Sequence, residues 1–275
     1  MPETTGIQHR IIYYIDGLNL HFSFRKKTWE ELNWLDIVKF CGNHLPARCN
    51  CSNLTVKYYT SLFEKHSRAG KAQDAFIKAN EKINTGRNTL EIIKGKHQMG
   101  SSWCGTCQDE TPKINEKKTD VNIAIDMLED AVIKNVCDIS VLISNDTDLV
   151  PSIKKIQQYK PQHRIVILVP PTDNINYDLQ YAAGSRTDEN VIVFLRGEYT
   201  NYLNAKLDEA VVINATHSVN RPDIYKREWL TEENRKLKEA EKERLKAAKS
   251  EHKLDSSLSV KSEDITALKN KFGSK

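Results

Sequence analysis

The sequence lacks the long apolar segments that direct a protein to a membrane. No apolar run approaches the length of a membrane-spanning helix, and the first ten residues, MPETTGIQHR, lack the apolar stretch of a signal peptide. We therefore expect a cytoplasmic protein that has no membrane partner. In that reducing compartment the six cysteines should be free thiols or metal ligands rather than disulfides.

The sequence also lacks a strong excess of charge of one sign. The formal net charge is +4, and residues 226–275 hold 14 basic and 10 acidic residues, so the rest of the chain is formally neutral. Such a body would have to contact nucleic acid through local patches. The tail, residues 226–275, has glutamate–lysine spacings typical of a solvated helix, and it could serve as a docking segment for a protein partner.

Apolar segments of strand length alternate with segments of helical periodicity, and the sequence has no internal repeat. This alternation predicts a mostly parallel sheet that is covered by helices on both faces. Residues 96–117 are polar, contain turn formers and lack a helical period, so they should form an inserted loop or hairpin. We place a domain at residues 8–197, its C-terminal extension at 198–225 and the charged helical tail at 226–275. The expected strands are residues 10–15, 54–63, 89–94, 139–143, 164–169 and 191–195, and the expected helices are residues 33–45, 68–84, 120–135 and a helix from about 149.

Four aspartates lie near predicted strand ends or helix starts. Asp16 ends the first strand, Asp120 opens the helix after the insertion, and Asp146 and Asp148 follow the strand at 139–143. In parallel α/β sheets such segments can converge at one edge. Taken singly, each aspartate could instead be a turn residue or a helix cap. Four carboxylates in one crevice would repel each other, and two Mg²⁺ or Mn²⁺ ions would neutralise them and could hydrolyse a phosphodiester.

The segments that contain these aspartates resemble the three motifs of NYN domains. They are residues 14–20 (YIDGLNL), 116–128 (EKKTDVNIAIDML) and 142–151 (LISNDTDLVP). NYN domains belong to the PIN-like nucleases, and over about residues 10–195 this sequence is similar to their LabA-like branch. The resemblance implies a three-layer α/β/α fold, Mg²⁺ or Mn²⁺ as the cofactor and RNA as the substrate. It also implies that the catalytic metal ligands are Asp16, Asp120, Asp146 and Asp148.

Other residues of these motifs are candidates for supporting roles. Asn19 should act with the catalytic aspartates by orienting a ligand or by touching the phosphate, and Ser144 should support the turn at Asp146. Asp126 lies six residues after Asp120, which corresponds to about 240° of rotation and about 9 Å of rise on a helix. It cannot easily bind the same ion, so we assign it an outer-shell or packing role.

The cysteines include two close pairs, Cys49 with Cys51 and Cys104 with Cys107. Together they predict one tetrahedral structural Zn²⁺ site, which would tie the loop before the second strand to the insertion. Residues 103–107 (WCGTC) also resemble the thioredoxin redox motif, but the flanking residues lack the strand and the helix that this motif needs. Simple buried or surface thiols are the remaining alternative.

Basic and aromatic side chains are interleaved in residues 21–29 (HFSFRKKTW), directly after the first motif. The aromatics could stack on unpaired bases while the cations contact phosphates. The alternative is a loop whose aromatics pack on the body and whose cations are solvated. The candidate substrate-binding residues are Arg25, Lys26, Lys27, Lys94, Lys96 and Lys118.

The sequence therefore predicts a Mg²⁺- or Mn²⁺-dependent (endo)ribonuclease. A noncatalytic RNA-binding adaptor with the same fold is one alternative, but it predicts a missing ligand, whereas all four aspartates are present. A metal-dependent phosphatase of another doubly wound family is the second alternative. Such an enzyme usually carries another aspartate two residues after the first, and the segment that begins at Asp16 lacks it.

Overall fold

The computed structural model describes the chain in seven ranges. They are residues 8–45, 49–84, 89–104, 109–171, 176–184, 191–193 and 202–226. The chain divides into two units, residues 1–226 and 227–275, and every described residue belongs to the first. Apart from Lys226, the predicted tail lies outside the described residues. No helix within the described ranges has the length and apolar character needed to cross a membrane.

A seven-stranded sheet in the order β4-β3-β2-β1-β5-β6-β7 forms the middle of the fold. Strand β1 pairs in parallel with β2 on one side and with β5 on the other, and β3, β6 and β7 continue the parallel pairing outward. Strand β4 is antiparallel to β3. The bounds are β1 (Gln8–Asp16), β2 (Asn50–Ser61), β3 (Thr89–Cys104), β4 (Asp109–Lys117), β5 (Ile139–Ile143), β6 (Arg164–Val169) and β7 (Val191–Val193).

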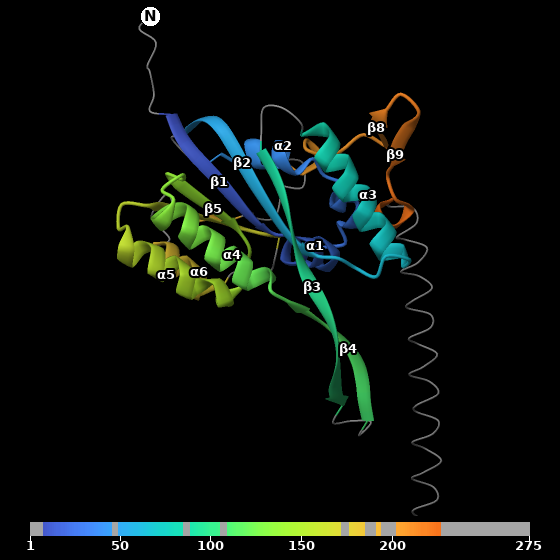
Figure 1. Cartoon of the computed structure of the whole chain (residues 1–275), viewed down its shortest axis with the longest axis horizontal. Helices are drawn as coiled ribbons and strands as arrows, with labels where there is room; N and C mark the ends of the chain where they lie inside the picture. Colours follow the sequence, from blue (N-terminus) through green and yellow to red (C-terminus); the bar gives the residue numbers. More distant parts are fainter. Residues whose placement is uncertain are drawn as a thin grey trace, which may run out of the picture. The chain divides into compact units, whose positions relative to one another are not determined.

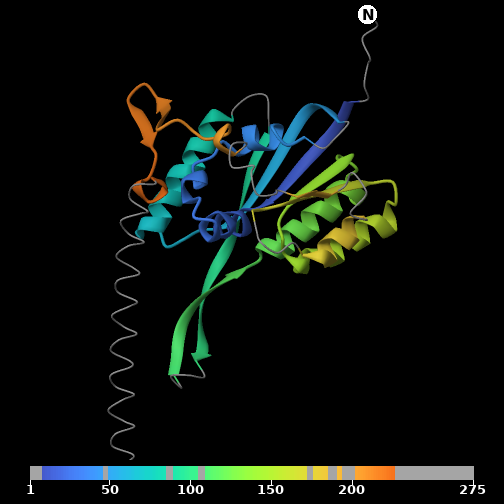
Figure 2. The same cartoon turned by 180° about the vertical axis from the view of Figure 1, so that it is seen from behind.

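Helices cover both faces of this sheet, as Figures 1 and 2 show from opposite sides. Side chains alternate along β1, so that Tyr13 and Ile15 lie in one core while Ile12 and Tyr14 lie in the other. The first core includes residues of α1 (Gly17–Lys26), α2 (Ile37–Gly42) and α3 (Arg68–Ile83). The second includes residues of α4 (Thr119–Leu128), α5 (Val150–Tyr159) and α6 (Tyr177–Ala183). The predicted three-layer α/β/α fold is therefore confirmed.

Several helices differ from the expected ones at their ends. The helix expected at residues 33–45 begins only at Ile37, because the carboxylate of Asp36 caps it by accepting hydrogen bonds from two backbone N–H groups. The helix expected at residues 120–135 ends as α4 at Leu128 and continues as a π-helical turn, Glu129–Ile133. Helices α1 and α6 lie where no helix was predicted.

The predicted insertion is a hairpin. The distal part of β3 pairs with β4 from Lys96 opposite Lys117 to Cys104 opposite Asp109. Figure 1 shows this pair of strands extending away from the centre of the sheet. The insertion therefore prolongs one edge of the sheet beyond the carboxyl ends of the central strands.

The register of this hairpin contradicts the predicted four-cysteine zinc site. Cys51 lies four residues before Thr55, which pairs with Thr89, and Cys104 lies 15 residues after Thr89. At about 3.3 Å per residue, Cys51 and Cys104 are separated by tens of ångströms along the strands. The ligands of one zinc ion lie only about 2.3 Å from it, so a single ion cannot bind both pairs within one chain. Cys107 and the side chain of Cys104 lie outside the described residues.

The segment after β7 belongs to the first core. Tyr202 is fully buried and stacks on Phe40, with ring centroids 5.1 Å apart. Strands β8 (Ala210–Asn214) and β9 (His217–Asn220) then form a two-stranded hairpin that contacts α3. Tyr225 is also buried, so the ordered packing continues to the end of the described part. The extension predicted at residues 198–225 thus contributes to the stability of the domain.

His163, between α5 and β6, is buried and titrates below its usual range. Its Nε2 lies 2.8 Å from the hydroxyl of Ser140, and its Nδ1 is buried without a hydrogen-bond partner among the described residues. Burial, followed by the charge of Lys160, lowers the pKa of His163 to about 4. The folded protein therefore keeps this imidazole neutral at pH values where the unfolded chain protonates it.

We predict that His163 makes the free energy of unfolding fall by on the order of 3 kcal/mol as the pH drops from 6.5 to 4. The folded pKa lies below the unfolded one, so this stabilisation is complete above pH 6.5 and is lost on acidification. His163→Gln removes the titrating group and keeps a side chain that can reach Ser140. Urea unfolding across this range should show a shallower pH dependence for the variant. Parallel pH profiles for the two proteins would contradict the assignment.

Candidate metal centre

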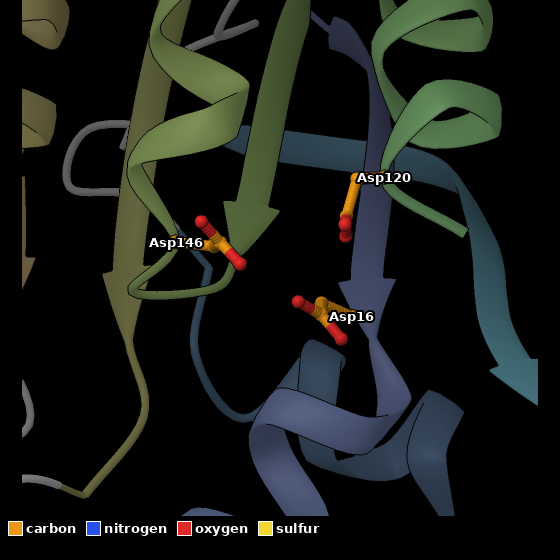
Figure 3. Close-up of side chains that lie close together, drawn as sticks. All are labelled: Asp16, Asp120 and Asp146. Atoms are coloured by element: carbon orange, nitrogen blue, oxygen red, sulfur yellow. The ribbon is translucent and has the colours of Figure 1, made fainter. Parts of the chain in front are cut away.

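Three aspartates from three separate segments meet at the carboxyl ends of the central strands. Asp16 is the last residue of β1, Asp120 lies in the first turn of α4, and Asp146 follows β5. One carboxylate oxygen from each residue lies within 4.8 Å of the other two. Figure 3 shows the three side chains around a common centre. The structure therefore brings together three of the four aspartates that the sequence predicts as metal ligands.

Asp16 is the most firmly held of the three. Asp16 is only 4% exposed as a residue, whereas Asp120 and Asp146 are partly exposed. One carboxylate oxygen of Asp16 accepts a hydrogen bond from the backbone N–H of Asn19 at 3.0 Å, and the other accepts one from the hydroxyl of Ser144 at 3.1 Å. The first of these bonds caps α1. Asp16 thus acts as a helix cap and as a member of the acidic cluster at once.

Gly17 allows α1 to begin directly after Asp16. A Cβ atom at this position would lie 2.5 Å from the ring of Tyr58 and 2.7 Å from the carbonyl oxygen of Tyr59. Such contacts are too short, so any larger residue would push the start of α1 away from β2. The Asp-Gly pair therefore marks a close approach of a helix to the sheet. Because α1 extends to Lys26, the interpretation of residues 21–29 as a loop is wrong for residues 21–26.

Ser144 and Asn145 connect Asp16 with Asp146. The fully buried hydroxyl of Ser144 donates to Asp16 and accepts from the backbone N–H of Asp146 at 3.1 Å. The side-chain oxygen of Asn19 accepts from the backbone N–H of Asn145 at 3.3 Å. Ser144 thus bonds to the turn at Asp146, and the side chain of Asn19 bonds to the loop after β5. The roles predicted for these two residues at the metal site stay predictions.

Asp120 is positioned by the junction between β4 and α4. Lys118 has a φ angle of 82°, in the left-handed region, and this turn lets the chain change from strand to helix. The next residue, Thr119, is buried, and its hydroxyl lies 3.4 Å from that of Ser61 at the end of β2. Asp120 follows immediately and faces the ends of β1 and β5 (Figure 3).

The other two acidic candidates lie elsewhere. Asp148 is exposed and is not part of the cluster of three, and its backbone N–H donates to the carboxylate of Asp146 at 3.0 Å. Asp126 accepts a hydrogen bond of 2.7 Å from the hydroxyl of Tyr59. Asp126 thus takes part in a hydrogen-bond network that lies further along α4.

That network contains a buried ion pair that was not predicted. Lys57 of β2 lies 2.6 Å from the carboxylate of Asp130, to which the hydroxyl of Tyr14 also donates at 3.0 Å. Lys57 and Asp130 are both buried, and Asp130 lies in the π-helical turn after α4. Burial raises the pKa of Tyr14 well above its usual range, so this phenol stays a neutral donor. The signal in the sequence is Lys57 itself, the one charged residue within β2.

The basic residues that the sequence predicts as substrate-binding differ in their exposure and in their position in the fold. Arg25 and Lys26 are exposed in the last turn of α1 and line an open hollow together with Asn19 and Asn145. Lys118 is exposed two residues before Asp120. The remaining candidates are Lys94, which is exposed on β3, Lys27, which is partly buried, and Lys96, whose side chain lies outside the described residues.

The donor set of the cluster fits a hard divalent cation. Carboxylate oxygens are the ligands that Mg²⁺ and Mn²⁺ prefer, and three negative charges so close together require neutralisation. Asp16, Asp120 and Asp146 would hold such an ion. The cysteines offer no comparable centre in the described part of the chain, where the thiol of Cys49 accepts a hydrogen bond from Arg164 at 3.2 Å.

The chain is similar to two known proteins over part of its length. The 6-hydroxy-3-succinoylpyridine 3-monooxygenase HspA of Pseudomonas putida (strain DSM 28022 / S16) is 27% identical over an alignment of 187 residues, and the alignment covers 57% of this chain and 58% of that protein. The chain thus spans somewhat more than half the length of this curated relative. A protein of unknown function, VPA0982 from Vibrio parahaemolyticus RIMD 2210633, matches with a TM-score of 0.43 and 14% identity over 71% of this chain and 98% of the other.

The family comparison covers the site itself. The model of the NYN domain matches residues 10–189, which include most of β1, all of α4 and β5, and the three clustered aspartates. This is well over half of the chain. The chain therefore belongs to the NYN domain family of PIN-like proteins.

Proposed function

We propose that this protein is a metal-dependent ribonuclease that hydrolyses RNA phosphodiester bonds at the cluster of Asp16, Asp120 and Asp146. The observation that carries the proposal is the meeting of three carboxylates, from β1, α4 and the loop after β5, within 4.8 Å. Asp16 and Asp146 each cap a helical segment, but capping does not require these two carboxylates and that of Asp120 to face one another. Their convergence is expected where a cation has to be held.

The residues of the chain fix the place of the reaction. A divalent cation, when bound, supplies Lewis acidity that activates water and stabilises the leaving oxygen of a phosphodiester. Asp16 is immobilised by Asn19 and Ser144, which preserves the position of its carboxylate before any ligand arrives. Asp120 and Asp146 are partly exposed and so face the side from which RNA would approach. We propose Asp148, which is exposed beside Asp146, as a fourth ligand once a second cation is present.

Oxidation of a pyridine is a second candidate function. The similarity to HspA, whose name describes a 6-hydroxy-3-succinoylpyridine 3-monooxygenase, is the observation that favours it. Such a reaction consumes O₂ and two electrons from a reduced donor, whereas RNA hydrolysis consumes only water. The two candidates are separated by measuring O₂ uptake with that pyridine and NADH, and RNA cleavage with Mn²⁺, on the same preparation.

We predict that Asp16→Asn, Asp120→Asn and Asp146→Asn each lower the rate of RNA cleavage by more than about 100-fold, because even changes around metal ligands cost about 10- to 100-fold. Asparagine keeps the size and the capping ability of aspartate, so the fold should persist. Cleavage of a labelled RNA with saturating Mn²⁺, together with thermal melts, checks this outcome. Asp126→Asn should have a milder effect.

The matched control is Asp74→Asn, which changes an exposed aspartate on α3 that pairs with Lys78 at 2.7 Å. It alters the net charge in the same way as the three test variants and should cleave RNA at the wild-type rate. EDTA should abolish RNA cleavage by the wild type and by Asp74→Asn. Wild-type rates for Asp16→Asn and Asp146→Asn would show that the carboxylates do not carry the reaction.

Metal binding is predicted to stabilise the folded protein. Mn²⁺ should raise the melting temperature of the wild type by several degrees, since a ligand that binds only the native state raises the free energy of unfolding with the logarithm of its excess over Kd. Without metal, Asp120→Asn should melt at or above the wild-type temperature, because one of three repelling charges is gone. The Mn²⁺-dependent increase should vanish in this variant. An equal increase in both proteins would place the ion elsewhere.

A further inference from the structure

The exposed face of α1 carries a second set of polar and aromatic groups beside the acidic cluster. Phe22 is 44% exposed, and Arg25 and Lys26 follow it at the spacings that place residues on one side of a helix. The opposite side of α1 buries Leu20 and Phe24 in the first core. The apolar anchoring of the helix therefore leaves an aromatic ring and two cations facing solvent.

These groups surround a hollow of suitable size for a nucleotide. The hollow has a volume of about 620 Å³, within the usual range of ligand pockets. Its lining residues are Asn19, Phe22, Ser23, Arg25, Lys26 and Asn145. The described residues include no carboxylate that forms a salt bridge with Arg25 or Lys26. The hollow therefore presents two cations, of which Arg25 also interacts electrostatically with Glu30.

The hollow adjoins the acidic cluster through two asparagines. Asn19 lies in its wall and donates its backbone N–H to Asp16, while Asn145 lies in its wall directly before Asp146. The side-chain oxygen of Asn19 accepts from the N–H of Asn145, and that of Asn145 accepts from the N–H of Asn176. With its oxygen engaged by Asn145, the side-chain amide of Asn19 can present its NH₂ group to the hollow. Donors and cations together favour an anionic ligand.

Phe22 is held in place before any ligand binds. His21 packs edge-on against it with ring centroids 5.3 Å apart, and Nδ1 of His21 lies 2.8 Å from the side-chain oxygen of Asn33. Burial lowers the pKa of His21, which favours the neutral form of its imidazole. A ring that is fixed and half-exposed can stack on a base, provided that the base is not already stacked within a duplex.

We propose that this hollow is a subsite for one nucleotide of an unpaired strand, with its phosphate on Arg25 and Lys26 and its base on Phe22. The inference deepens the proposed nuclease function, on which it rests, by naming single-stranded RNA as the form that the site accepts. The metal cluster then receives the phosphodiester next to the bound nucleotide. A continuous duplex is a poor ligand, because its bases cannot leave the stack to reach Phe22 without cost.

The test measures binding separately from cleavage. The full chain with Asp146→Asn is titrated in EDTA against a fluorescein-labelled ten-nucleotide RNA, either single-stranded or paired with its complement, by fluorescence anisotropy at several salt concentrations. Phe22→Ala should weaken binding of the single strand about fivefold or more, while Phe22→Trp should retain it. The double variant Arg25→Gln/Lys26→Gln should reduce the slope of log K against log salt by about 1.4, since each phosphate contact contributes about 0.7 for a single strand.

Lys155 and Tyr159 supply the matched control. They form an exposed cation–aromatic pair on α5, with the Lys155 Nζ 5.3 Å from the Tyr159 ring centroid. Lys155→Gln and Tyr159→Ala should leave binding and its salt slope unchanged. Equal affinity for the duplex and the single strand, or wild-type binding by Phe22→Ala and by the double variant, would overturn the subsite. Lack of RNA cleavage by the wild type in Mn²⁺, with these binding effects intact, would instead overturn only the nuclease function.

Discussion

The mutual repulsion of Asp16, Asp120 and Asp146 is the constraint on which the site depends. Three carboxylates whose oxygens lie within 4.8 Å separate unless the backbone holds them and a cation compensates their charge. The sheet provides the backbone restraint, because β1 and β5 are parallel neighbours that end at the same edge. The hydroxyl of Ser144 bonds to both segments there. The fold therefore concentrates negative charge at one defined place, which is what binding of a divalent cation requires.

A second group of charges, the ion pair of Lys57 and Asp130, is buried on the side of the sheet that α4 covers. Lys57 and Asp130 form a buried ion pair that fastens the end of α4 to β2, while Asp120 lies at the start of the same helix. Removing one partner of such a pair typically costs about 3–5 kcal/mol, because the other charge stays buried. Charged groups therefore lie at both ends of α4, with Asp120 in its first turn and the Lys57–Asp130 pair just beyond its last residue.

The sequence was sufficient for the layers and for most of the acidic cluster, because both depend on local patterns. The runs at 139–143 and 164–169 are apolar throughout, and such runs form central parallel strands. The features that could not be predicted from the sequence depend on tertiary contacts. Helix α1 is short and weakly periodic and is fixed by the contact of Gly17 with β2, and the register of the β3–β4 hairpin decides that the cysteine pairs lie apart. Asp148 looks equivalent to Asp146 in sequence, yet the turn between them directs it to solvent.

The central claim is that Asp16, Asp120 and Asp146 jointly bind a divalent cation. It is tested most directly by anomalous diffraction at the manganese edge from crystals of the protein grown or soaked with Mn²⁺. The account predicts an anomalous peak within coordination distance, about 2–2.2 Å, of a carboxylate oxygen from each of the three aspartates. Well-ordered crystals that show all three side chains but no peak between them at saturating Mn²⁺ would contradict it.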